Sequence, residues 1–158
     1  MYKPVIRIII GSQSDLEMIQ PCLDILGKFG VIYELKILSA HRQPKILVRY
    51  IKEASQRQTK IFIAAAGGAA ALAGVVAAHT TLPVIGVPVE TRSLKGLDSL
   101  LSTVQMPGGV PVACMAIGKA GAKNAAIFAL QILALNDKKI ANKLLIYKRK
   151  LASLVKTK

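Results

Sequence analysis

The stretch that decides the fold is Val5-Ile6-Arg7-Ile8-Ile9-Ile10-Gly11-Ser12-Gln13-Ser14-Asp15. Its first six residues are β-branched except for Arg7, which is typical of a strand buried on both faces. Gly11 ends this run, and a helical pattern begins at Leu16, where apolar residues recur every three or four positions. A buried strand that leads directly into an amphipathic helix indicates an α/β fold.

The same alternation continues along the chain. Apolar runs predict strands at residues 5–10, 31–38, 61–66, 83–87 and 111–117. Helical patterns follow at residues 16–26, 44–54, 69–78, 94–105 and 124–135. Five strand-helix units in this order predict an α/β/α three-layer fold, with a parallel five-stranded sheet and right-handed crossovers.

Length and composition fit one domain of this kind. The chain has 158 residues, of which 53% are hydrophobic, and this excludes an intrinsically disordered chain. Aromatic residues are scarce, with 3 Phe, 4 Tyr and no Trp. The core must therefore consist of Ile, Leu, Val and Ala, which suits a parallel sheet covered by helices.

The last segment differs in composition from the rest. We place the α/β domain at residues 1–135 and a basic C-terminal helix at residues 136–158, which carries eight basic residues against one acid. Its apolar residues are spaced by four and three positions, and they are Ile140, Leu144, Tyr147, Leu151 and Leu154. Such a narrow stripe fits two alternatives: the helix packs on its own domain, or it docks on a neighbouring subunit.

The formal net charge is +14, and a charge this positive is typical of proteins that bind nucleic acid. Half of this excess lies in the terminal segment, and aromatic residues that could stack on bases are missing among the basic ones. The sequence therefore predicts no nucleic-acid partner. The apolar stretch near the N-terminus is too short for a signal peptide or a membrane span, and the separated Cys22 and Cys114 indicate small buried residues in a reducing compartment. We expect a cytoplasmic protein without a membrane partner.

Ligands of open parallel sheets bind at the carboxyl ends of the strands, so the loops there are the places to search. Four such loops are Gly11–Asp15, Ser39–Pro44, Ala66–Ala70 and the Gly118-Lys119 pair. Glycine allows the backbone to approach a ligand, and serine hydroxyls and free amides at a helix start favour an anion such as phosphate. The alternatives are a helix cap at Ser14 or Asp15 and an unliganded tight turn at Gly67-Gly68.

His41 is one of only two histidines and stands beside Arg42 in the second loop. An imidazole can accept and return a proton near neutral pH, so His41 is the candidate acid and base. The alternative is a structural or merely exposed histidine. His79 follows an Ala-rich helical stretch and is expected to cap it. The sequence contains no His-Glu-x-x-His motif, metal-ligand cluster or carboxylate pair, so we predict no metal site.

These loops resemble those of the class I N5-carboxyaminoimidazole ribonucleotide mutases of bacterial purine synthesis, the PurE family. The resemblance spans about 135 residues. It is carried by Gly11–Asp15, Ser39–Pro44, Ala66–Ala70, Leu82–Val89, Gly96–Leu101 and Val104–Pro111.

The resemblance implies a flavodoxin-like fold, a homo-octamer whose C-terminal helix extends onto a neighbour, and a reaction without metal, nucleotide or biotin. In that reaction a carboxyl group moves from the exocyclic amine of an aminoimidazole ribonucleotide to ring carbon C4. His41 would be the acid and base, Ser12 and Arg42 would bind the phosphate, and Asp15 the ribose. The full set of substrate-binding residues implied is Ser12, Ser14, Asp15, Ser39, Arg42, Gly67, Gly68, Ala69 and Ala70. An ATP-dependent synthase that makes the carbamate substrate is the implied functional partner.

The sequence departs from the family at two sites. Leu16 stands where the family usually has Trp, and the usual Gly-Gly-Ala-Ala-His-Leu-Pro-Gly turn has Ala71 in place of a second active-site histidine and Ala73 in place of proline. Because of Ala71, a catalytically idle scaffold is one alternative. Another is the family's second class, which carboxylates aminoimidazole ribonucleotide directly with CO2. A response-regulator receiver is excluded because Ala64-Ala65-Ala66 occupies the place of its aspartate, and a flavin carrier because the loops lack aromatic residues.

Overall fold

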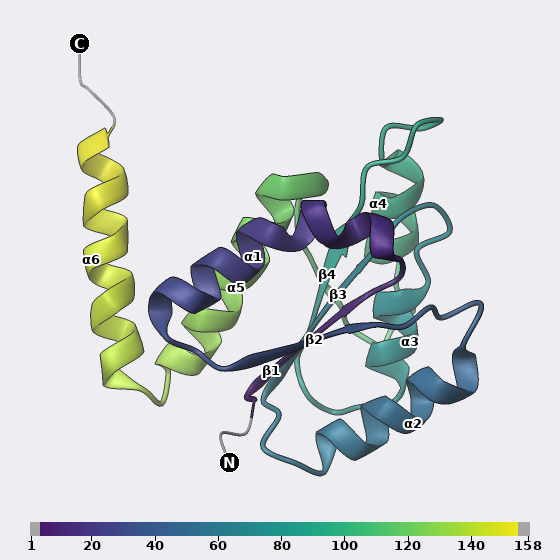
Figure 1. The fold of residues 1–158 in the computed structure, drawn as a ribbon, viewed down its shortest axis with the longest axis horizontal. Helices are drawn as coiled ribbons and strands as arrows, with labels where there is room; N and C mark the ends of the chain where they lie inside the picture. Colours follow the sequence, from purple (N-terminus) through teal and green to yellow (C-terminus); the bar gives the residue numbers. More distant parts are fainter. Residues whose placement is uncertain (1–3, 155–158) are drawn as a thin grey trace.

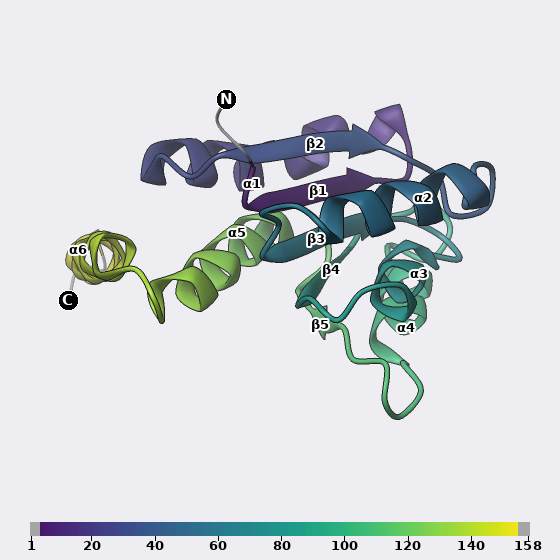
Figure 2. The same cartoon turned by 90° about the horizontal axis from the view of Figure 1, so that it is seen from below.

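The computed structural model describes residues 4–154, and its centre is the parallel five-stranded sheet that the sequence predicts. The strands are β1 (Ile6–Ile10), β2 (Tyr33–Ile37), β3 (Ile61–Ala66), β4 (Val84–Pro88) and β5 (Ala113–Cys114). They lie in the order β2-β1-β3-β4-β5 (Figures 1 and 2). The order reverses beside β1, and ligands of such sheets bind at this point.

Helices cover both faces of the sheet, as expected for three layers. They are α1 (Leu16–Phe29), α2 (Pro44–Ser55), α3 (Leu72–Ala78), α4 (Leu97–Val104), α5 (Gly118–Ala134) and α6 (Lys138–Leu154), and a short 3-10 turn, η1 (Gln13–Asp15), precedes α1. Helices α1 and α5 pack together on one face, whereas α2, α3 and α4 lie on the other (Figures 1 and 2).

The two faces of β1 explain its nearly continuous apolar sequence. Ile6, Ile8 and Ile10 pack into the core under α1 and α5, whereas Ile9 packs into the core under α2 and α3. All four side chains have no exposed surface. A strand buried on both faces needs apolar residues at successive positions rather than at alternate ones.

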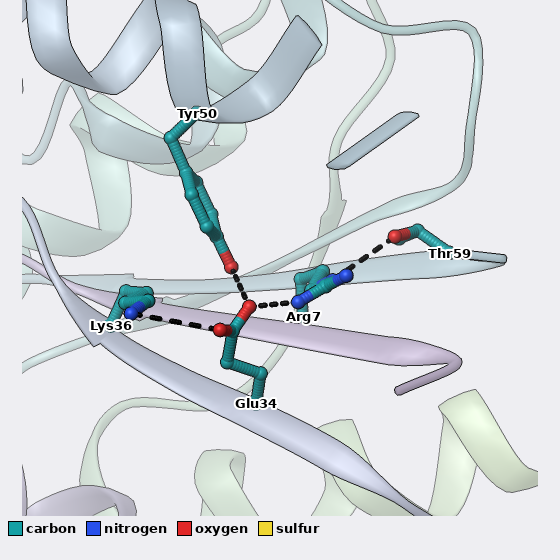
Figure 3. Close-up of polar contacts among 5 residues, drawn as sticks. All are labelled: Arg7, Glu34, Lys36, Tyr50 and Thr59. Carbon is teal, nitrogen blue, oxygen red and sulfur yellow. Dashed lines mark hydrogen bonds and ion pairs between the residues drawn. The ribbon is translucent and has the colours of Figure 1, made fainter. Parts of the chain in front are cut away.

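Arg7 is the polar exception in β1, and it is bonded on several sides. Its guanidinium pairs with the Glu34 carboxylate on β2 and donates through Nε to Thr59 Oγ1 at 3.1 Å. Glu34 also accepts a hydrogen bond of 2.8 Å from the Tyr50 hydroxyl on α2 (Figure 3). A buried charge is tolerated only when it is paired and hydrogen-bonded, so this cluster fastens β1, β2 and α2 together.

We predict that Glu34→Gln destabilises the fold by about 1.5–3 kcal/mol, because the Arg7 charge, with a side chain only 5% exposed, loses its anionic partner. The matched control is Lys36→Gln, which removes the more exposed partner of Glu34 at 3.6 Å. A surface pair of this kind contributes about 0–1 kcal/mol. Urea unfolding of both variants measures the difference, and equal losses would contradict the role given to the Arg7–Glu34 pair.

Several helix and strand ends differ from the sequence expectation. The fifth strand is only two residues long, and α5 begins at Gly118 rather than at residue 124. The first turns of α5 consist of glycines, alanines and two lysines without a stripe of large apolar residues. A Cβ at Gly121 would lie 1.6 Å from the Ala116 carbonyl oxygen. This close approach requires glycine there, and it hides the helix from a pattern of large apolar side chains.

Helix α6 packs at the amino-terminal end of the sheet, away from the loops that follow β1 and β2 (Figure 1). Ile140, Leu144 and Tyr147 contact the core of this same chain, and the Tyr147 ring meets Phe29 edge to face. Leu151 is 41% exposed. The side chain of Leu154 and residues 155–158 of the expected terminal segment lie outside what the structure describes. Among the described residues, none of the helices is both long enough and apolar enough to span a bilayer.

Candidate functional site

A cavity of about 480 Å³ opens at the carboxyl ends of the strands, at the point where the strand order reverses. The loops after β1, β2, β3 and β4 surround it. Its lining comprises Gly11, Ser12, Ser14, Asp15, Ser39, Ala40, His41, Arg42, Ala66, Gly67, Ala70, Ala71, Leu72, Val89, Glu90 and Thr91. The structure therefore brings together residues from three of the four loops singled out in the sequence.

The loop after β1 is ordered by its own hydrogen bonds. Ser12 is the N-cap of η1, and its amide donates to Asp15 Oδ2 at 3.0 Å in a capping box. The Ser14 hydroxyl lies 3.0 Å from Ser12 Oγ and 3.3 Å from Asp15 Oδ1. Ser12 thus caps η1, and Asp15 closes the capping box and stands at the N-cap position of α1 without a side-chain cap bond there. Ser12, Ser14 and Asp15 also face the cavity.

Asp15 is the buried acid of this cavity, with 7% of its surface exposed. Burial raises the pKa of Asp15, while hydrogen bonds from Ser14 and from the Ser12 amide and the charge of Arg42 act in the opposite direction. A carboxylate oxygen can accept more than one hydrogen bond, so Asp15 can cap the loop and still accept from a ligand hydroxyl.

The loop after β2 contributes the only histidine and the only arginine of the lining. The Arg42 amide donates to Ser39 Oγ at 3.2 Å, and Arg42 Nη2 donates to the Gly11 carbonyl at 3.2 Å. This second bond holds the guanidinium against the backbone of the β1 loop, and Ser12 and Ser14 line the same cavity. His41 and Arg42 are exposed, so a ligand can reach both side chains.

The turn after β3 enters the site only in part. Gly67 and Ala70 line the cavity, whereas Gly68 and Ala69 are not among its lining residues. Gly68 adopts a left-handed backbone with φ of 69°, and its amide donates to Ser99 Oγ at 2.9 Å. The Gly68 amide is therefore turned toward α4 and away from any ligand in the cavity.

The loop after β4 was not predicted as part of the site from the sequence. Val89, Glu90 and Thr91 follow β4 and close the cavity on the side of α4. They contain no glycine, histidine or paired serines, but the rule that searches the carboxyl end of every strand would have found them. Gly118 and Lys119, which follow β5, are not in the lining; Lys119 pairs instead with Glu17 on α1.

The two histidines differ in their surroundings. His79 is the C-cap of α3, as expected, and its Nδ1 lies 2.8 Å from the Val75 carbonyl oxygen. His41 faces the cavity. Within residues 4–154, no group of three or more His, Cys, Asp or Glu side chains is placed to hold a metal ion. Cys22 is buried and burial raises the pKa of its thiol to about 12, whereas Cys114 is only half-buried.

The lining can hold a phosphorylated sugar and move a proton. Serine hydroxyls and a guanidinium bind phosphate oxygens, a carboxylate binds sugar hydroxyls, and an imidazole exchanges protons near neutral pH. Small residues on the β3 side leave room for a flat ring.

Comparison with known proteins agrees with this chemistry. The family model described as AIR carboxylase matches residues 5–153. A protein of Bacillus subtilis named N5-carboxyaminoimidazole ribonucleotide mutase is 55% identical over 90% of this chain and 88% of its own length. One of the same name from Pyrococcus horikoshii is 49% identical over 99% of this chain and 87% of its own. The crystal structure of PurE from Treponema denticola superimposes with a TM-score of 0.88 at 31% identity, covering 97% of this chain and 94% of that one.

Proposed function

The chain belongs to the AIR carboxylase family, and we propose that it is an N5-carboxyaminoimidazole ribonucleotide mutase, an isomerase of purine biosynthesis. The observation that carries this proposal is identity of about 50% to named mutases over most of the chain. The cavity supports it, because one pocket gathers groups suited to phosphate, ribose and proton transfer.

Two loops would bind the ribonucleotide. Ser12, Ser14 and Ser39 would donate to phosphate oxygens, and Arg42 would add a charged contact. The 3.2 Å bond from Arg42 to the Gly11 carbonyl supports this role, because it holds the guanidinium at the residue that precedes Ser12. Asp15 would accept from the ribose hydroxyls.

His41 would act as the acid and then the base. The bond between the exocyclic nitrogen and the carbamate carbon breaks, CO2 is released within the cavity, and His41 protonates the nitrogen. Ring carbon C4 then attacks the CO2, and His41 removes the proton that C4 carried. His41 gives one proton to the nitrogen and regains one from C4, and the carboxyl group is conserved. The reaction therefore needs no further reactant. Holding both fragments in one cavity makes their recombination effectively unimolecular.

The β3 turn would lie beside the migrating carboxylate, with backbone groups of Gly67 and Ala70 nearest to it. Gly68 and Ala69, which the resemblance also implies, would support this turn rather than contact the ligand, because the Gly68 amide is bonded to Ser99.

The rival within the family is direct carboxylation by CO2, and the assay that separates the two supplies each substrate in turn. We expect the purified protein to convert N5-carboxyaminoimidazole ribonucleotide to the C4-carboxylated product. Aminoimidazole ribonucleotide with bicarbonate should react much more slowly. Turnover of the second substrate alone would favour direct carboxylation, and turnover of neither would favour an idle scaffold.

Ala71 tests how much the family's second histidine matters. Ala71 lines the cavity at the start of α3, so the side chain of Ala71→His would enter the site. We predict that the natural chain is active and that Ala71→His changes its turnover by less than about tenfold, because a single acid-base group contributes about 10²–10⁴-fold and His41 supplies it. Steady-state kinetics measures both. An inert parent that Ala71→His activates would show that the second histidine is indispensable.

The exposed apolar side chains of α4 and α6 bear on the oligomeric state. We propose a cytoplasmic homo-octamer that needs no cofactor and works after an ATP-dependent synthase. Large exposed apolar side chains support an assembly: Leu97 and Leu101 lie on α4, and Leu145 and Ile146 on the part of α6 that points away from its own core. Sedimentation equilibrium would give the mass of eight chains, whereas the mass of one chain would contradict the proposal.

A further inference from the structure

Ser99 links two sides of the cavity without lining it. It lies in the first turn of α4, has no exposed surface, and is bonded on both sides of its hydroxyl. Ser99 Oγ accepts from the Gly68 amide at 2.9 Å and donates to the Val89 carbonyl at 2.7 Å. Gly68 belongs to the turn after β3, and Val89 to the loop after β4.

The turn after β3 and the loop after β4, which Ser99 joins, are also in direct contact with each other. A Cβ at Gly67 would lie 3.4 Å from Val89 Cβ and 3.5 Å from Thr91 Cγ2. The β3 turn therefore rests directly on the β4 loop, and a small shift of one moves the other. The last backbone bond of this part of the sheet joins the Val89 amide to the Ala66 carbonyl. Beyond it, the buried Ser99 hydroxyl bonds to both segments, whereas the exposed Ser102 hydroxyl reaches only the Gly68 carbonyl, at 3.4 Å.

Asp98, the residue before Ser99 in α4, also bonds to the β4 loop. The Thr91 hydroxyl donates to the Asp98 carboxylate, at 2.8 and 3.0 Å from its two oxygens, and accepts from the Gly96 amide at 3.3 Å. Thr91 is thereby anchored to the start of α4. The first turn of α4 thus fixes both the turn that faces the carboxylate and the loop opposite it.

We infer that Ser99 is a positioning residue for carboxyl transfer: its hydroxyl holds the Gly67–Ala70 turn at the distance from the Val89–Thr91 loop that the migrating carboxylate requires. This inference rests on the proposed function. Phosphate and ribose bind to other loops, so Ser99 acts on the reacting end of the substrate alone. A displacement of about 1 Å near reacting groups can cost about a hundredfold in rate.

The test compares Ser99→Ala with Thr103→Val, which removes another buried hydroxyl from α4. Thr103 donates at 2.7 Å to the Ser99 carbonyl within the helix and touches neither side of the cavity. Alanine is smaller than serine and favours helices more, so Ser99→Ala should fold. Kinetics gives kcat and KM for each variant, and amide hydrogen exchange at Gly68 reports on the turn whether or not the protein is active.

We expect Ser99→Ala to lower kcat by about tenfold with KM within about threefold, and to speed exchange at Gly68 by at least about tenfold, because the amide loses its acceptor. Thr103→Val should leave all three values near those of the parent. Parental kcat or parental Gly68 exchange in Ser99→Ala would overturn the inference, as would an equal fall in kcat in Thr103→Val. A parent that converts no substrate would overturn the proposed function instead, and these outcomes are distinct.

Discussion

Replacing His41 with asparagine is expected to lower turnover by at least about 10²-fold, the lower bound for loss of a general acid-base group. Asparagine retains similar size and a hydrogen-bonding nitrogen but cannot exchange protons near neutral pH. His41 is the only histidine of the cavity lining, and the buried Asp15 is committed to the loop after β1. Binding of the product ribonucleotide should persist, because we propose that other residues make its phosphate and ribose contacts.

The matched control for His41→Asn is His79→Asn. His79 lies at the end of α3, outside the cavity lining, and bonds to a backbone carbonyl. The His79→Asn variant should be slightly less stable than the parent, since surface substitutions of this kind have small effects. Its turnover should stay within about twofold of the parent's. A His41→Asn protein with turnover within tenfold of the parent would remove the acid-base role. Joint loss of folding and binding would show that His41 holds its loop.

Arg42→Ala is expected to weaken ribonucleotide binding by about 1.5–3 kcal/mol, the contribution of a hydrogen bond to a charged group, or roughly 10- to 150-fold in Kd. The guanidinium lies against the Gly11 carbonyl and lines the same cavity as the serines with which we propose that it binds the phosphate. Its removal also frees the carbonyl of Gly11, which water can reach in the open cavity.

Titration calorimetry with the product nucleotide measures the effect of Arg42→Ala, and Arg49→Ala is its control. Arg49 lies on the exposed side of α2 and is absent from the cavity lining, so its removal lowers the net charge equally without touching the site. Unchanged affinity in Arg42→Ala would refute the phosphate contact. An equal loss in both variants would indicate long-range attraction by the positive charge.

Much of the fold could be predicted from the sequence because buried parallel strands require consecutive apolar residues. Ile6–Ile10 and Ile61–Ala66 were recognisable for this reason. The early start of α5 was not recognisable, because its first turns lack large apolar residues and pack by close backbone approach at Gly121. The packing of Ile140 and Tyr147 on their own domain also depends on tertiary contacts that the stripe in the sequence does not specify.

The candidate site was predictable to the extent that its residues are chemically distinctive. His41, Arg42 and the serines of the first loop stood out, and the structure places them around one cavity. The orientation of Gly68 could not be predicted, because it depends on a hydrogen bond to a helix about thirty residues further along. Ser99 lies within the Gly96–Leu101 motif of the resemblance, but its role could not be predicted, since a serine within a helix is ordinary unless its partner is known.

In the reaction that we propose, one cavity holds the substrate and its carboxyl group together throughout the transfer. The most direct test supplies N5-carboxyaminoimidazole ribonucleotide with a ¹³C-labelled carboxyl group in a solution rich in unlabelled bicarbonate. Mass spectrometry of the product then measures how much label reaches C4. We predict that most of the product carries the label, because CO2 recombines before it leaves the cavity. A product with the isotopic composition of the dissolved bicarbonate would contradict the claim and show that CO2 comes from solution.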